Sequence, residues 1–179
     1  MNRKSTTTKL AVAGIFTAIA VVGSFISFPL FGSKCSPVQH LVNVLCGILL
    51  GPGWGLGSAF VASLLRNLLG LGSLMAFPGS MCGALICGLL YKYIRKIPVA
   101  VAGEVVGTGI LGGMLAYPVA VLLMGVSAAS IGYFAYVIPF LISTVVGSII
   151  ATVLLYALKG AGVLSKMQAS LGTLPKKRA

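Results

Sequence analysis

Three long apolar runs dominate the sequence, at residues 10–31, 99–126 and 131–158. Each approaches or exceeds the roughly 20 residues that cross the hydrocarbon core of a bilayer as a helix. Only 8% of the positions are charged, whereas a soluble domain carries about a quarter charged residues. The chain is therefore expected to be an all-α membrane protein whose outer surface faces lipid.

Shorter apolar segments between these runs complete a predicted bundle of six transmembrane helices. The expected spans are residues 10–31, 38–50, 56–69, 80–91, 99–126 and 131–158. The second, third and fourth are shorter than a full crossing, so each alone could be re-entrant. The first run is too long for a signal peptide and is interpreted as a retained helix. The expected division is a basic tail (1–9), a transmembrane domain (10–158) and a second basic tail (159–179).

The net charge of +12 comes from positive charges that are grouped along the sequence. This grouping indicates that the charges determine the membrane topology. Eleven of the 13 basic residues precede the first span, separate the fourth from the fifth, or follow the last: Arg3, Lys4, Lys9, Lys92, Arg95, Lys96, Lys159, Lys166, Lys176, Lys177 and Arg178. Six crossings place all three groups on one side, as the positive-inside rule requires, with both termini cytoplasmic. A site for nucleic acid or anionic lipid is the less favoured explanation.

Glycine pairs spaced four apart are frequent among the 24 glycines, for example Gly79 with Gly83 and Gly103 with Gly107. Small residues at this spacing let helices approach closely in lipid, so internal packing is expected. In the first span, Ala11, Gly14 and Ala18 form a small-residue face. This face could dock another membrane protein, and internal packing explains its spacing equally well.

Polar residues inside predicted spans mark the candidate binding site, because such residues are costly in a membrane. Gln39, His40 and Asn43 share one flank near the outer end of the second span, and Arg66 and Asn67 lie at the outer end of the third. An outward-facing pocket between the two helices is one hypothesis. Snorkelling by Arg66, with the other side chains joining helices, is the alternative.

Glu104 is the only acidic residue, and it lies inside the fifth span. It is a candidate ligand contact, proton carrier or partner of the basic loop at 92–96. Four aromatic residues are candidates for stacking on a flat ligand, although an interfacial aromatic belt explains them as well. They are Phe77, Tyr117, Tyr133 and Tyr136.

The sequence contains no recognisable motif for an active site, a cofactor site or a metal site. Residues 107–112 match GxGxxG, but they follow no strand and lie inside an apolar run, which excludes a dinucleotide site. The chain has no aspartate for a Ser-His-Asp triad and no GxxxxGK[ST] motif. Its four cysteines form no CxxC pair, and one histidine cannot complete a zinc site with them. No enzyme, cofactor or metal is expected.

Three stretches carry a resemblance to a known family: SPVQHLVNVLCGILLGPGW (36–54), AFVASLLRNLLGLGSLMAFPGSMCGALICGLLYK (59–92) and GEVVGTGILGGMLAYP (103–118). They resemble the ThiW family, whose members are substrate-binding S components of energy-coupling-factor (ECF) vitamin transporters. The run at 66–81 is the most specific part.

The resemblance implies a bundle of six helices, in the plasma membrane of a prokaryotic cell, that captures a vitamin precursor from outside. It implies as partners a transmembrane coupling subunit and two cytoplasmic ATPases, and as ligand the thiamine precursor hydroxyethylthiazole. S components dock through small residues of the first helix, for which Gly14 and Ala18 are the nearest match here. The rival hypotheses are a stand-alone secondary carrier, coupled to protons through Glu104, and a membrane enzyme or scaffold.

Overall fold

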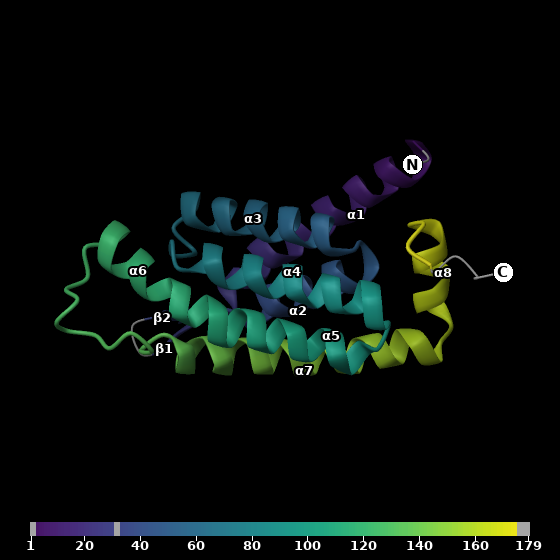
Figure 1. The fold of residues 1–179 in the computed structure, drawn as a ribbon. Coiled ribbons are helices and arrows are strands. Elements are labelled where there is room, and N and C mark those ends of the chain that lie inside the picture. Colours follow the sequence, from purple (N-terminus) through teal and green to yellow (C-terminus); the bar gives the residue numbers. More distant parts are fainter. Residues whose placement is uncertain (1–2, 31–32, 175–179) are drawn as a thin grey trace.

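The computed structural model describes residues 3–30 and 33–174, and most of these residues are helical (Figure 1). In chain order the elements are α1 (Arg3–Val22), the 3-10 turn η1 (Gly23–Phe25), β1 (Phe28–Leu30), β2 (Ser33–Cys35), α2 (Pro37–Leu49), α3 (Pro52–Leu68), α4 (Ala76–Ile94), α5 (Ile97–Glu104), the π-helical η2 (Val105–Gly112), α6 (Gly113–Leu123), α7 (Val137–Gly160) and α8 (Val163–Ser170). The α5, η2 and α6 segments follow one another without a break.

Prolines lie in the first turn of three helices: Pro37 and Pro52 begin α2 and α3, and Pro98 is the second residue of α5. Proline suits the first helical turn, because its φ angle is already helical and its missing N–H has no partner to lose there. For this reason α3 and α5 begin before the predicted positions 56 and 99. Likewise α4 begins at Ala76, four residues before the predicted start of the fourth span at position 80.

A short β-hairpin replaces the end of the predicted first span. α1 ends at Val22, and β1 pairs antiparallel with β2, with Pro29 opposite Lys34. Pro29 would break a continuing helix but is tolerated in an edge strand. At the other end α1 begins at Arg3, inside the predicted tail 1–9.

Four helices of the described part of the chain are long and apolar enough to cross a membrane: Ser5–Phe25, Ala76–Ile94, Ile97–Leu123 and Val137–Gly160. α2 has only 13 residues, of which all but two are buried. It packs against α1, α3, α4 and α7, so protein rather than lipid surrounds it.

The distribution of residue sizes suits a lipid environment. Large apolar side chains such as Ile15, Leu122 and Val153 are more than half exposed on the outer surface. Glycines lie where helices touch: a Cβ on Gly112 of η2 would stand 2.5 Å from the Cα of Gly79 in α4, and one on Gly107 would stand 2.9 Å from the Cα of Gly83. Such close approach is how helices gain packing energy in lipid, where water does not drive their association.

The bundle has two chemically different ends (Figure 1). The hairpin end contains β1 and β2, the first turns of α2, α4 and α7, and the last turn of α3. The basic end contains the α4–α5 junction, the end of α7 and α8, with Lys92, Arg95, Lys96 and Lys159. α8 lies in the predicted tail 159–179 but packs on the bundle, because Gln168 is buried and donates to the Tyr91 hydroxyl at 3.0 Å.

Candidate functional site

A small cavity lies at the hairpin end, with a volume of about 30 Å³. Its walls come from the hairpin, α2, α3, α4 and α7, and consist mostly of polar side chains. The lining residues are Ser33, Lys34, Ser36, Gln39, His40, Arg66, Ser73, Ala76, Ser80, Pro139, Phe140 and Ser143. This volume is about the share of one water molecule in the liquid, so the structure is closed around the site.

Two amide side chains connect a buried cation to a buried anion below this cavity. Arg66 Nη1 donates to Gln39 Oε1 at 3.2 Å, and Gln39 Nε2 donates to Asn43 Oδ1 at 3.2 Å. Asn43 Nδ2 then donates to Glu104 Oε1 at 3.1 Å. The two charged groups that end this series of hydrogen bonds fix the orientation of both amides. A guanidinium can only donate, and a carboxylate accepts. The aligned dipoles offset the cost of burying Arg66 and Glu104, which are 3% and 0% exposed.

Two further side chains, Thr108 of η2 and His40 of α2, lie within hydrogen-bond distance of Glu104. Thr108 Oγ1 lies 3.0 Å from Glu104 Oε1, one helical turn away, and His40 Nδ1 lies 3.1 Å from the same oxygen. With its proton on Nδ1, His40 donates to the carboxylate. Glycine makes this arrangement possible, because a Cβ on Gly83 would stand 2.5 Å from Glu104 Oε2 and would overlap the Thr108 hydroxyl.

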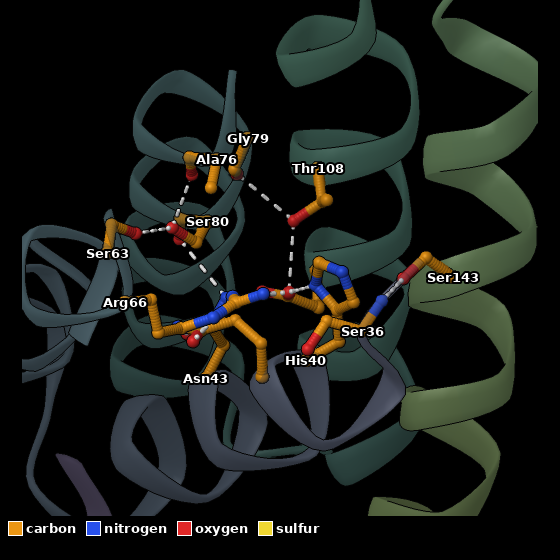
Figure 2. A network of polar contacts seen from close by, with 12 residues as sticks. Ser36, His40, Asn43, Ser63, Arg66, Ala76, Gly79, Ser80, Thr108 and Ser143 are labelled. Carbon is orange, nitrogen blue, oxygen red and sulfur yellow. Dashed lines mark hydrogen bonds and ion pairs between the residues drawn. The ribbon is translucent and has the colours of Figure 1, made fainter. Parts of the chain in front are cut away.

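Hydroxyl groups extend the network to α3 and to the start of α4, as Figure 2 shows. The Ser63 and Ser80 hydroxyls are 2.9 Å apart, and Ser80 also donates to the Ala76 carbonyl. Thr108 lies 3.1 Å from the Gly79 carbonyl. The π-helical segment η2, which contains Thr108, is thereby joined to the first turns of α4. π-helical turns occur frequently at functional sites.

Three contacts hold the hairpin over the cavity. The Ser36 amide donates to Ser143 Oγ at 2.8 Å, and the Cys35 thiol donates to the Pro139 carbonyl at 3.3 Å. Both contacts attach the end of the hairpin to the first turns of α7. Lys34 Nζ contacts the Gly70 carbonyl at 3.4 Å, on the loop between α3 and α4. Since the cavity has room for about one water molecule, a larger ligand requires part of its walls to move.

Two polar atoms of the lining residues are buried and have no hydrogen-bond partner within the described residues: Arg66 Nε and Ser36 Oγ. Leaving such an atom unpaired costs about 1–3 kcal/mol. The structure therefore leaves one N–H donor and one hydroxyl group without a partner on residues that line this small cavity. Across residues 3–30 and 33–174, no cluster of His, Cys, Asp and Glu could hold a metal ion.

Comparison with known protein families assigns the chain to a family. The sequence pattern of the family described as thiamine-precursor transporter protein (ThiW) matches residues 10–161. The chain belongs to the ThiW family. The matched region contains the cavity, the polar network and all the helices that could cross a membrane except the first few residues of α1. ThiW is a transporter family, and the chain is a membrane protein of that family.

A sensor histidine kinase, YpdA of Escherichia coli (strain K12), is 34% identical over 107 residues. The match covers 59% of this chain but only 18% of that protein. The chain thus corresponds to a small part of the kinase, and nothing of the kinase's activity is carried over to this ThiW family member.

The structure brings five of the residues expected at the site together. Gln39, His40 and Arg66 line the cavity, and Asn43 and Glu104 are bonded to them from below. Arg66 is buried and bonded to Gln39, so it does not snorkel outward. Glu104 faces His40 and Asn43 instead of the basic loop at 92–96.

The other five expected residues lie elsewhere in this ThiW family member. Asn67 donates to the Ser63 and Ser73 carbonyls and so shapes the α3–α4 loop. Tyr117 stacks on Tyr133 at 5.0 Å and Phe77 packs against Phe60, outside the cavity lining. Tyr136 is buried in the neighbouring apolar cluster beside Phe140.

Several residues of the site were not expected from the sequence: Ser36, Ser80, Thr108, Phe140 and Ser143. Phe140, rather than a tyrosine, supplies the aromatic wall. A signal for α7 existed in the sequence, because the buried residues Phe140, Ser143, Gly147 and Ala151 repeat every three or four positions. A stripe of small and polar residues in an apolar helix marks the side that faces protein.

The small-residue face of α1 divides into two sides. Ala13, Thr17 and Ala20 are buried within the bundle. Gly14 and Ala18 instead line an apolar groove of about 490 Å³ between α1 and α3, and a Cβ on Gly14 would meet no atom within 4 Å. Ala11 is exposed but does not line this groove.

Proposed function

We propose that this ThiW family member is the substrate-capturing subunit of an ECF-type ATP-driven importer, and that its ligand is the thiamine precursor hydroxyethylthiazole. The observation that carries the proposal is the cavity at the hairpin end, whose lining includes the unpaired Arg66 Nε and Ser36 Oγ. The family description supports a thiamine precursor as cargo. In this proposal ATP hydrolysis belongs to two cytoplasmic ATPases, which act through a transmembrane coupling subunit.

The proposed topology has six crossings in the plasma membrane of a prokaryotic cell: α1, α2, α3, α4, the continuous helix α5–η2–α6, and α7. Both termini and the basic end are cytoplasmic, as the positive-inside rule favours. The short α2 is compatible with this count because protein surrounds it, so its length need not match the bilayer. The cavity then opens to the outside.

The ligand chemistry fits the groups at the cavity. Hydroxyethylthiazole is a small, flat, neutral molecule with one hydroxyl group and one ring nitrogen. The Arg66 Nε–H can donate to an acceptor such as the ring nitrogen, and Ser36 Oγ can pair with the hydroxyl. Phe140 offers a face for the ring. Because the closed cavity is much smaller than usual ligand sites, binding requires the hairpin to open and then close again.

The groove between α1 and α3 is the proposed docking surface for the coupling subunit, through Gly14 and Ala18 with Ala11 beside them. Open space at Gly14 and apolar walls support this role. Replacing Gly14 with Leu should fill the groove and prevent co-purification with the coupling subunit, while ligand binding by the isolated chain stays unchanged. Unimpaired co-purification would contradict the docking surface but not the ligand.

The decisive experiment is calorimetric titration of the purified chain with hydroxyethylthiazole, the pyrimidine precursor and thiamine. We expect saturable binding of the thiazole. Ser36→Ala removes a hydroxyl that has no partner in the closed structure and should weaken thiazole binding about tenfold, with folding unchanged. Ser148→Ala is the matched control, because its hydroxyl is also buried and unpaired within the described chain. No heat with the thiazole and a clear signal with another compound would reassign the ligand.

A stand-alone carrier coupled to protons is the second candidate, and the contact between His40 and Glu104 is the observation that favours it. Glu104→Gln keeps an acceptor oxygen but cannot exchange a proton. If uptake continues in cells without any ATPase partner and is abolished by Glu104→Gln, the carrier replaces the importer subunit as the function.

A further inference from the structure

A cavity of about 570 Å³ at the basic end has no role in the proposed import function. It lies between the α4–α5 junction, the end of α7 and α8, on the opposite end of the molecule from the hairpin (Figure 1). Arg95, Lys96 and Lys159 line it, together with Tyr91, Tyr156 and Gln168. No acidic residue lines this cavity, because Glu104, the only acid in the sequence, is buried against α2. The cavity therefore offers positive charge with no acidic side chain to balance it.

An apolar groove continues from this cavity along the same two helices. Val101 and Val105 line the groove from α5 and η2, and Val145, Ile149 and Val153 line it from α7, with a volume of about 250 Å³. The cavity holds Ile97 and Pro98 of α5 and Tyr156 and Lys159 of α7, which are the next turns toward the basic end. Together, the groove and the neighbouring turn at Tyr156 extend about 17 Å along α7, from position 156 to position 145, at 1.5 Å per residue. This is about half the thickness of the hydrocarbon core of a bilayer.

We propose that an anionic phospholipid binds here, with its phosphate head group in the basic cavity and one acyl chain in the groove between α5 and α7. Charge complementarity selects the head group, and the apolar groove selects a lipid over a soluble phosphate. Basic pockets between transmembrane helices bind anionic head groups in this way. In the proposed topology the lipid belongs to the cytoplasmic leaflet.

The backbone at Arg95 supports a role for its side chain. Arg95 ends α4 in the left-handed region, with φ of 58°, and it is the only non-glycine residue with positive φ in the described parts of the chain. Glycine serves this position with less strain. Arg95 lies over the Tyr91 ring at 5.5 Å and donates to the Thr173 carbonyl at 2.9 Å, so its guanidinium is held beside the cavity.

Native mass spectrometry of the purified full chain tests the proposal, with phosphatidylglycerol and phosphatidylcholine of equal chain length as probes. We expect phosphatidylglycerol to be retained at least tenfold better. Arg95→Gly relieves the left-handed strain, so the variant should fold, yet it should lose most of this preference. Lys96→Gln combined with Lys159→Gln should lose it as well.

Lys9→Gln combined with Lys166→Gln is the matched control, because it removes two charges at the same end from residues that do not line the cavity. It should keep the preference. Ile149→Trp fills the groove and should weaken lipid retention. Equal retention of both lipids, an equal loss in the control pair, or displacement of the lipid by inorganic phosphate at matched concentration would each overturn the proposal.

Discussion

At the scale of single residues, the site is a set of hydrogen bonds that converge on one carboxylate oxygen. Glu104 Oε1 lies within 3.1 Å of donors from His40, Asn43 and Thr108. The bonds from His40 and Asn43 join α2 to α5, whereas the bond from Thr108 lies within the continuous helix α5–η2. In a low-dielectric interior, losing one donor leaves a buried charge less well compensated.

Thr108→Val tests this network, because it removes the hydroxyl and keeps the shape of the side chain. The single hydroxyl proton of Thr108 is shared between the Gly79 carbonyl and Glu104. Its loss leaves one of these buried acceptors without a donor, so the free energy of unfolding in detergent should fall by about 1–3 kcal/mol. Thr144→Val is the control. Thr144 is also fully buried, but its hydroxyl has no partner in the described structure, and its replacement should be neutral or stabilising. Equal losses in the two variants would show that the Glu104 network contributes nothing specific.

The sequence predicted the residues of this site better than their contacts. Gln39, His40 and Asn43 share a flank because helical periodicity alone places them there. The meeting of His40 with Glu104 depends on how far α2 and α5 slide past each other, which Gly83 and η2 permit and which no local pattern encodes. Asn67, next to Arg66 in sequence, points to backbone carbonyls of a loop whose path could not be foreseen.

At the scale of elements, the hairpin is the part of the site most able to move. Apart from its own two strands, its described anchors are three contacts, from Lys34, Cys35 and Ser36. Its first strand lies at the end of the span predicted at 10–31, and its second strand lies between the spans predicted at 10–31 and 38–50. α8 was not predicted either, because its short amphipathic segment lay within a basic tail.

Cys35 reports on this motion, because its thiol is 1% exposed in the closed structure and burial raises its pKa. In a chain whose other three cysteines are alanine, maleimide should modify Cys35 slowly. Ser143→Ala removes the acceptor of the Ser36 amide and should speed modification about fivefold, as expected for a bond of about 1 kcal/mol.

Ser148→Ala, at another buried hydroxyl of α7, should leave the rate of Cys35 modification unchanged. A rate that is insensitive to Ser143 would mean that the hairpin does not open by separating from α7. Saturating hydroxyethylthiazole should slow the reaction further, if the ligand closes the hairpin.

At the scale of the whole molecule, the charge pattern and the fold divide the protein into a polar site at the hairpin end and a basic end opposite to it. The mostly helical character of the chain followed from hydropathy, and four of its helices are long and apolar enough to cross a membrane. The inward burial of α2 did not follow from hydropathy, because its apolar sequence is equally compatible with contact to lipid or to protein.

The proposed orientation predicts the result of labelling intact cells with an impermeant thiol reagent, in chains without native cysteines. Lys34→Cys, exposed on the hairpin, should react from outside. Lys166→Cys, exposed on α8, should react only after the membrane is opened. The reverse labelling pattern would show that the protein has the opposite orientation in the membrane, with the cavity on the cytoplasmic face.

The enclosure of α2 also has a consequence for biogenesis. α2 is made early, yet the helix that supplies its last covering, α7, is made near the end of synthesis. Until α7 arrives, Gln39 and His40 have no complete protein shell, and a bilayer is a poor solvent for them. A ribosome stalled before residue 137 should therefore release a nascent chain that quality-control proteases degrade, whatever the strength of its hydrophobic segments.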